Sequence, residues 1–189
     1  MKRVFILVVL SSPAFGQKPV MDLAALRDLR DRCIPDAPFS TLAAIVQTES
    51  GGNPYAIQVD FPIALLRRWH MRPGTLRLAR QPKDGAEALA WMQYLSSFDI
   101  FTDIGLMQVS TAEAQRRKIE PLTLFEPCTN LRIGWQILQD DYAIEVKHYG
   151  PGQTALEHAI SRYNTGTSNG GIDNGYYARV VFKNSISLR

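Results

Sequence analysis

The sequence predicts a single, mainly α-helical domain with few short strands. Most segments repeat apolar residues at the spacing of an amphipathic helix, and only residues 104–109 form a convincing candidate strand. The 189 residues are 46% hydrophobic, which is enough for one domain with a substantial core. No internal repeat, low-complexity run or linker divides the chain, so we expect one folded unit.

The helices can be placed in order along the chain. The first is expected over residues 22–32, where leucines alternate with charged residues. Prolines interrupt the chain before the second helix, for which Ser40 is a suitable N-cap and which ends at Glu49. A third helix covers residues 84–96, and the capping box from Ser110 to Glu113 opens a fourth. The remaining apolar stripes predict helices at 130–146, 154–163 and 176–182.

The N-terminus has the pattern of a secretory signal peptide over residues 1–16. Lys2 and Arg3 precede a short apolar run, and small residues follow before Gly16. The apolar run is far shorter than the roughly 20 residues that span a bilayer, and no cysteine near Gly16 indicates a lipid anchor. We therefore expect a mature domain of residues 17–189 without a stable membrane anchor. The alternative, an N-terminal strand or buried helix, stays open.

The charge of the chain limits its expected partners. Lys2 and Arg3 are the only charged residues of 1–16, so their removal takes the net charge from +3 to +1. No basic stripe is interleaved with aromatic residues, so nucleic acid is not expected as a partner.

Cys33 and Cys128 are an even pair in a chain that looks exported, which favours a disulfide over two buried thiols. No metal site is expected, because none of the three histidines has ligand spacing.

Glu49 is the first candidate for chemistry. It follows the apolar run at 42–46 at the end of a helix, and Gly51 and Gly52 come directly after. Apolar neighbours and the negative end of the helix dipole both disfavour a carboxylate, so the pKa of Glu49 should be raised. A protonated glutamic acid near neutral pH can act as the general acid in glycosidic bond cleavage. Seen alone, the segment also fits a surface glutamate before a glycine C-cap.

Two further segments extend the pattern. Residues 103–110 contain Gly-Leu-Met-Gln, and residues 160–166 contain Tyr-Asn-Thr-Gly. Together with Glu49-Ser50 they resemble, in order, the three motifs of family 1 lytic transglycosylases, lysozyme-like enzymes that cleave bacterial cell-wall glycan. The resemblance covers roughly residues 40–181 and includes the segment at 125–134. Residues 80–89 and 174–181 are similar to the branch of accessory muramidases of type IV secretion and conjugation systems.

The resemblance implies a lysozyme-like domain with an insertion at roughly 56–102. It also implies a periplasmic enzyme that cleaves the β-1,4 bond of peptidoglycan between N-acetylmuramic acid and N-acetylglucosamine and leaves 1,6-anhydro ends. Such an enzyme needs no cofactor, and we expect a monomer that opens the cell wall for a secretion or conjugation apparatus. The insertion either lines the glycan groove, with Trp69 or Arg72 touching sugar, or packs as core.

The resemblance also implies the site residues. Glu49 is the catalytic acid, and Tyr163 directs its hydroxyl at Glu49 unless it bonds a backbone carbonyl. Ser50 fixes the helix end. Tyr176 and Tyr177 both compete for the place of the family's C-terminal tyrosine, and spacing favours Tyr176. The residues implied in substrate binding are Ser50, Gly105, Gln108, Ser110, Tyr163, Asn164 and Tyr176.

Three other functions remain open from the sequence. A hydrolytic, goose-type lysozyme would need a second carboxylate, for which Asp60, Asp99 and Asp103 are candidates. A non-catalytic scaffolding module of a secretion system is the second, although an intact Glu49 speaks against it. The third is an enzyme that acts on chitin-like polymers, which lack the lactyl ether.

Overall fold

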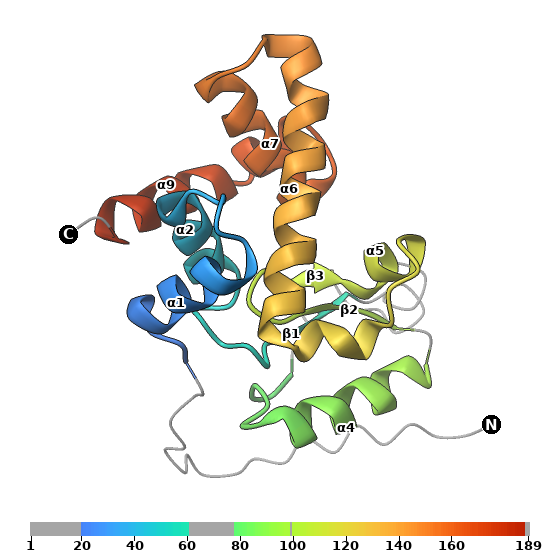
Figure 1. Cartoon of the computed structure of the whole chain (residues 1–189). Helices are drawn as coiled ribbons and strands as arrows, with labels where there is room; N and C mark the ends of the chain where they lie inside the picture. The colour runs from blue at the N-terminus through green and yellow to red at the C-terminus, as the bar shows by residue number, and fades with distance from the viewer. Residues whose placement is uncertain (1–19, 61–77, 99, 188–189) are drawn as a thin grey trace.

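The computed structural model describes residues 20–60, 78–98 and 100–187. This part of the chain is mainly α-helical with one small sheet (Figure 1). The predicted leader at 1–16 lies outside it, as do Trp69, Arg72 and Asp99. No helix among the described residues is long and apolar enough to cross a membrane.

The helix α6 (Pro127–Tyr149) runs through the middle of the molecule (Figure 1). Glu126 precedes it and accepts hydrogen bonds from the backbone N–H groups of Cys128 and Thr129, and Pro127 occupies the first turn. Gly150, with φ of +73°, ends the helix. α7 (Gln153–Thr165) folds back against α6 and makes an antiparallel pair with it.

The helix α2 (Phe39–Glu49) forms the centre of the core. Its residues 42–46 are fully buried, and such a segment needs neighbours on every side. α1 (Leu23–Cys33) packs against α2 and α6, and α9 (Tyr176–Ser187) lies along α2 (Figure 1). α2 begins at Phe39 after Pro38, so Ser40 lies inside the helix and the predicted Ser40 N-cap was wrong.

The sheet has the order β1-β2-β3 and is antiparallel throughout. β1 (Ile57–Asp60) pairs with β2 (Phe101–Ile104) in the register Ile57 to Ile104, and Ile104 also pairs with Val109 of β3 (Val109–Ser110). The predicted strand at 104–109 was therefore wrong in extent. Gly105 and Gln108 both have positive φ, so the chain turns there instead of continuing as a strand.

The remaining elements surround this frame. Asp84 caps α4 (Gly85–Ser96), whose N-terminus follows the undescribed part of the predicted insertion, and β1 was not predicted. Ser110 caps α5 (Thr111–Arg116) as predicted, but Glu113 pairs with Arg117 rather than closing the capping box. Two short elements complete the order, the 3₁₀ helix η1 (Pro121–Phe125) and α8 (Gly170–Asp173).

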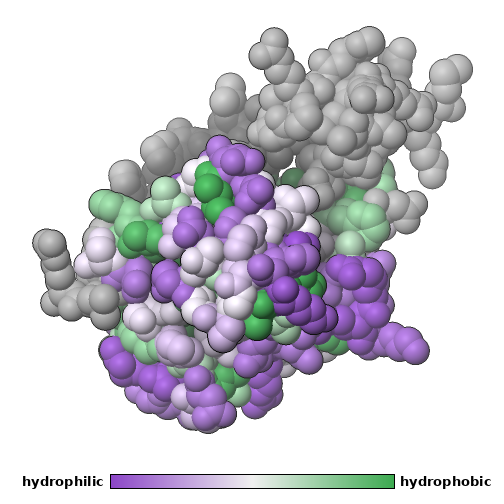
Figure 2. All heavy atoms as spheres, turned by 90° about the horizontal axis from the view of Figure 1, so that it is seen from above, coloured by the Kyte–Doolittle hydropathy of each residue, from purple (hydrophilic) through white to green (hydrophobic). Residues whose placement is uncertain are grey.

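The surface seen from above is mixed in character. Figure 2 shows mostly hydrophilic to neutral residues there, with the apolar residues of the described part in small separate groups. Single exposed apolar residues are normal on protein surfaces and do not by themselves indicate a partner.

A disulfide joins Cys33, the last residue of α1, to Cys128 in the first turn of α6. Their Cα atoms lie 5.5 Å apart although the residues are 95 positions apart in sequence. The predicted pairing is thus present in the structure. It ties the segment before α2 to the helix that carries much of the core.

We expect the Cys33→Ser/Cys128→Ser double variant to be less stable by about 2–5 kcal/mol, because the opened loop regains conformational entropy in the unfolded state. Chemical denaturation of the oxidised wild type and the variant measures this difference. Equal free energies of unfolding would show that the bridge does not stabilise the fold.

Candidate active site

Glu49 is the last residue of α2, directly after the buried apolar turns. Ser50 follows as the C-cap, and Gly51 and Gly52 take positive φ values that turn the chain away. A Cβ at Gly52 would lie 2.6 Å from the backbone oxygen of Met21, so only glycine fits there. This local sequence leaves the Glu49 carboxyl at the end of the core helix.

The carboxyl of Glu49 is partly buried and hydrogen-bonded. The hydroxyl of Tyr176, the first residue of α9, donates a short hydrogen bond to Glu49 Oε1. Burial raises the pKa of Glu49 from 4.5 to about 7, against the lowering effect of the Tyr176 hydrogen bond. The charge of Asp103 adds to the rise, and that of Arg179 opposes it. The predicted direction of the pKa shift is confirmed, and its main cause is burial.

The two candidate C-terminal tyrosines have separate positions. Tyr176 is buried against Glu49, whereas the hydroxyl of Tyr177 accepts a hydrogen bond of 3.5 Å from Gln153. Burial, and then the charge of Glu49, raises the pKa of the Tyr176 hydroxyl well above its usual value, so it stays a donor. Of the two, Tyr176 is the residue that meets the candidate acid.

Tyr163 lies nearby but bonds elsewhere. Its hydroxyl donates to the backbone oxygen of Met107 at 2.7 Å, so the expectation that it directs this hydroxyl at Glu49 was wrong. Burial raises its pKa well above the usual value, and the charges of Glu49 and Asp103 add to the effect. Gly134 of α6 makes this packing possible. A Cβ there would lie 2.7 Å from Met107 and 3.1 Å from the Tyr163 hydroxyl.

The 105–108 turn is held by Asn130, a buried residue in the first part of α6. Its side-chain oxygen accepts from the backbone N–H of Met107 at 2.8 Å. Its amide donates to the backbone oxygens of Ile104 at 2.7 Å and Leu124 at 2.9 Å. A Cβ at Gly105 would lie only 2.4 Å from the Asn130 amide nitrogen, so the glycine is required by space as well as by its φ of +79°.

The amide of Gln108 closes the same turn from inside. Its Nε2 donates to the backbone oxygens of Gly105 at 2.9 Å and Ala56 at 3.2 Å. Both N–H donors are therefore used within the protein, and the oxygen is the polar atom left to face a ligand. Leu106 and Met107 are fully buried, in agreement with their predicted role in core packing.

Ser50 and Ser110 stabilise the ends of elements. The Ser50 hydroxyl lies 2.8 Å from the backbone oxygen of Leu106 and accepts from the N–H of Gly52 at 3.2 Å, so it ties the end of α2 to the 105–108 turn. Ser110 caps α5 through the N–H of Ala112. These contacts give both serines structural roles, and only Ser50 adjoins Glu49 in the chain.

Asn164 is exposed near the end of α7 and meets the segment before Tyr176. Its side-chain oxygen accepts from the Asn174 amide at 2.9 Å, and Asn174 accepts from the backbone N–H of Tyr176 at 2.8 Å. The end of α7 is thus linked to the start of α9. Gly166, in the left-handed region at φ of +75°, ends α7 as the motif predicts.

Asp103 is the second carboxyl whose charge acts on Glu49. It lies in β2 opposite Ser110 and Gln58. The side chain of Asp60 and the whole of Asp99 are outside the described residues, so the structure does not compare them with Asp103. Among the residues that the structure describes, no group of three or more histidine, cysteine, aspartate or glutamate side chains could hold a metal ion.

Several residues around the site had no role assigned from the sequence. Asn130 and Gly134 belong to the segment at 125–134 that carried part of the resemblance, but their contacts with the 105–108 turn are apparent only in three dimensions. Arg179 lies one turn into α9, over the ring of Tyr176. The sequence signal that could have found Arg179 was its position three residues after Tyr176, which was already a candidate.

Comparison with known proteins shows the family to which the chain belongs. The family model of the transglycosylase SLT domain matches residues 32–184. The type IV secretion system protein virB1 of Brucella abortus is 37% identical over 145 residues, which are 76% of this chain and 55% of that protein. The protein virB1 of Agrobacterium fabrum is 28% identical over 175 residues, or 93% of this chain and 65% of that protein.

A third similar protein is the protein virB1 of Rhizobium radiobacter, at 30% identity over 153 residues. The chain thus spans a little over half the length of the Brucella and Rhizobium relatives. No solved structure matches the chain significantly.

The raised pKa of Glu49 predicts how stability depends on pH. Because the folded state holds this proton more tightly than the unfolded state, the contribution of Glu49 to stability is fully present below pH 4.5 and is lost as pH rises to about 7. This interval corresponds to a loss of about 3 kcal/mol. Glu49→Gln cannot ionise, so its stability relative to wild type should rise by about that amount across the interval.

Denaturant unfolding of both proteins across this pH range measures the difference. The variant Glu120→Gln, which changes an exposed glutamate, is the matched control and should follow wild type. A constant difference between Glu49→Gln and wild type would mean that the pKa of Glu49 is not raised.

Proposed function

Since this chain belongs to the transglycosylase SLT domain family, we propose that it is a lytic transglycosylase that cleaves peptidoglycan glycan strands. Family membership confirms the predicted fold class, a mainly α, lysozyme-like SLT domain with few short strands. The observation that carries the proposed activity is the Glu49 carboxyl, partly buried and with its pKa raised to about 7. A carboxylic acid with this pKa is matched to donating and accepting a proton near neutral pH.

In the first step Glu49 donates its proton to the oxygen that links N-acetylmuramic acid to N-acetylglucosamine. The bond between C1 and this oxygen breaks as positive charge develops on the muramyl ring. Glu49 is left as a carboxylate, which Tyr176 and Arg179 stabilise by a hydrogen bond and by charge. These two groups would keep the ionised form within reach although burial disfavours it.

In the second step the Glu49 carboxylate takes the proton from the muramyl 6-hydroxyl. That oxygen attacks C1 and closes the 1,6-anhydro ring, so the acid is regenerated and no water is consumed. The substrate supplies the nucleophile that a second carboxylate supplies in retaining glycosidases. One carboxylic acid is sufficient for this route.

The other site residues would orient the glycan. The Gln108 side-chain oxygen can accept from a sugar hydroxyl or acetamido N–H, because both of its N–H donors are held by the backbone. Asn164 is exposed beside the Tyr176 segment and is available to a sugar. Ser50, Gly105, Ser110 and Tyr163 would act by shaping this surface, since their contacts are with the protein itself.

We place the enzyme in the periplasm, beside a type IV secretion or conjugation apparatus. Residues 1–16 carry the pattern of a signal peptide, and the relatives include proteins named for type IV secretion. Local cleavage of glycan would open the cell wall for such an assembly. The mature domain would then comprise residues 17–189.

A hydrolase that uses Asp103 as second carboxylate is the alternative. The observation in its favour is that the charge of Asp103 contributes to the raised pKa of Glu49. Such an enzyme would add water and release reducing ends. It differs from the lytic route in its dependence on Asp103 and in the mass of its product.

Replacement of the acid tests the proposed activity. Glu49→Gln keeps the shape of the side chain but cannot donate the proton, so turnover of purified sacculi should fall by at least about 100-fold. Glu120→Gln serves as the control and should retain full turnover. A Glu49→Gln variant within tenfold of wild type would reject Glu49 as the acid.

Product analysis separates the lytic from the hydrolytic route. Mass spectrometry of the released muropeptides should find 1,6-anhydro ends, lighter by one water than the hydrolytic product. Asp103→Asn should keep a good fraction of turnover, because the muramyl 6-hydroxyl of the substrate supplies the nucleophile and no second carboxylate is needed. Reducing ends together with an inactive Asp103→Asn variant would establish the hydrolase instead.

A further inference from the structure

The segment that brings Tyr176 to Glu49 is rich in glycine and contains only one short helix, α8. Residues 165–175, which we call the α7–α9 connection, consist largely of glycine, asparagine, serine and threonine. Glycine-rich backbone loses more conformational entropy than other backbone when it is fixed. The connection has hydrogen bonds of its own, in α8 and between Thr167 and Gly170, and contacts from outside add to them in fixing its conformation.

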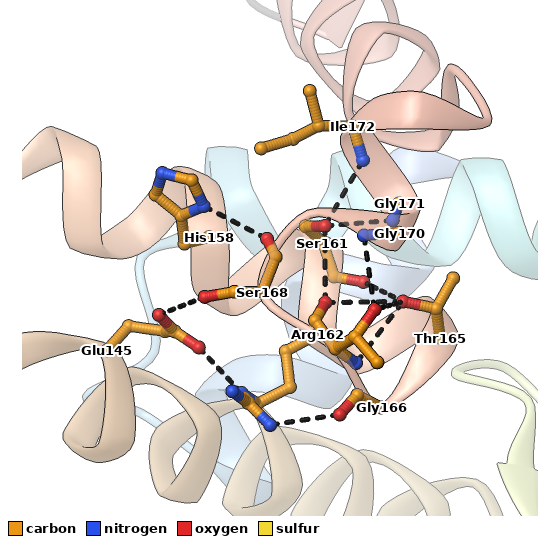
Figure 3. A network of polar contacts seen from close by, with 11 residues as sticks. Glu145, His158, Ser161, Arg162, Thr165, Gly166, Ser168, Gly170, Gly171 and Ile172 are labelled. Atoms are coloured by element: carbon orange, nitrogen blue, oxygen red, sulfur yellow. Dashed lines mark hydrogen bonds and ion pairs between the residues drawn. The ribbon is translucent and has the colours of Figure 1, made fainter. Parts of the chain in front are cut away.

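The first of these contacts comes from Glu145, a fully buried residue of α6. Its Oε1 accepts from Arg162 Nε at 2.6 Å, and its Oε2 accepts a short hydrogen bond from the Ser168 hydroxyl (Figure 3). Arg162 also donates to the backbone oxygen of Gly166 at 2.9 Å. Burial by itself would raise the pKa of Glu145, but the Ser168 and Arg162 hydrogen bonds and the charges of Arg162 and His148 together lower it, which favours the carboxylate.

A second contact fastens the middle of the connection. The hydroxyl of Ser161 accepts from the backbone N–H groups of Gly171 at 2.8 Å and Ile172 at 3.1 Å (Figure 3). A Cβ at Gly171 would lie 2.7 Å from the backbone of Ser161, so the approach is as close as glycine allows. The connection is thus held by α6 at one point and by α7 at another.

The end of the connection reaches the candidate acid. Asn174 accepts from the backbone N–H of Tyr176 at 2.8 Å and so sets the start of α9. Tyr176 then donates to Glu49, which lies 127 positions earlier in the sequence. A continuous series of contacts therefore runs from Glu145 to the carboxyl of Glu49.

We propose that Glu145, Arg162 and Ser168 are positioning residues that fix the α7–α9 connection so that the Tyr176 hydroxyl meets Glu49. A buried ion pair is not needed for stability, because apolar residues of similar volume often serve as well. It does supply directed bonds to Ser168 and, through Arg162, to Gly166. The consequence for turnover rests on the proposed function, but the effect on Glu49 can be measured without turnover.

The test is a ¹³C NMR titration of the Glu49 side-chain carboxyl. The groups that act on Glu49 are Tyr176 and Arg179 from α9 and Asp103 from β2, with Tyr163 of α7 nearby. Because the Tyr176 hydrogen bond lowers the pKa of Glu49, Tyr176→Phe should raise this pKa, by about one unit.

Ser168→Ala and Glu145→Gln should shift the pKa of Glu49 in the same direction. Glu145→Gln removes a negative charge, which by charge alone would lower the pKa of Glu49, so a rise can come only from lost positioning. Ser168→Ala changes no charge and is the milder variant if Glu145→Gln fails to fold. In the Tyr176→Phe background, neither substitution should add a further rise.

Asp140→Asn is the matched control. Asp140 also lies on α6 and pairs with Arg117 at 2.6 Å, but this pair does not touch the connection. The control should not raise the pKa of Glu49.

Turnover gives a second readout. In wild type it should decline with rising pH around the pKa of Glu49, and in the variants that raise this pKa the decline should move to higher pH.

The proposal is overturned if Tyr176→Phe raises the pKa of Glu49 while Ser168→Ala and Glu145→Gln leave it unchanged. It is also overturned if Tyr176→Phe has no effect, because the hydrogen bond would then be missing. If wild type does not turn over sacculi at all, the proposed function fails, and the titration still decides on positioning.

Discussion

The close packing of one face of α6 against the segments around Glu49 is the constraint on which the site depends. Asn130, Gly134 and Glu145 lie on this face at helical spacing. Asn130 holds the 105–108 turn, Gly134 admits Met107 and Tyr163, and Glu145 holds the α7–α9 connection through Arg162 and Ser168. Because one rigid helix carries all three contacts, the separate motifs are kept in a single geometry.

The electrostatics of Glu49 follow from this geometry. Burial at the end of α2 disfavours the carboxylate, whereas the Tyr176 hydroxyl and the charge of Arg179 favour it. The two groups that favour the carboxylate come from α9, whereas Asp103, whose charge disfavours it, comes from β2. The balance leaves the pKa near neutrality, where one group can give a proton and take another back. A small change in the position of α9 would alter this balance.

Polar side chains near the site mostly serve the protein rather than a ligand. The serine after the acid, the glutamine of the turn and Tyr163 all make hydrogen bonds to backbone oxygens. The turn itself needs these bonds, because its backbone cannot pair as a strand where φ is positive. Much of what resembles a binding motif in the sequence is therefore the support that makes the site rigid.

The sequence by itself determined the helices, the family and the candidate acid, since these follow from apolar spacing and from residues that are neighbours in the chain. It also indicated the Cys33–Cys128 pair, since no other cysteine exists. Only the tertiary structure decided that Tyr176 meets Glu49, that Tyr163 does not, and that β1 pairs with β2. Spacing in the sequence favoured Tyr176 over Tyr177, but these contacts join distant segments, and a local pattern does not specify which partner a hydroxyl or an amide meets once the helices have packed.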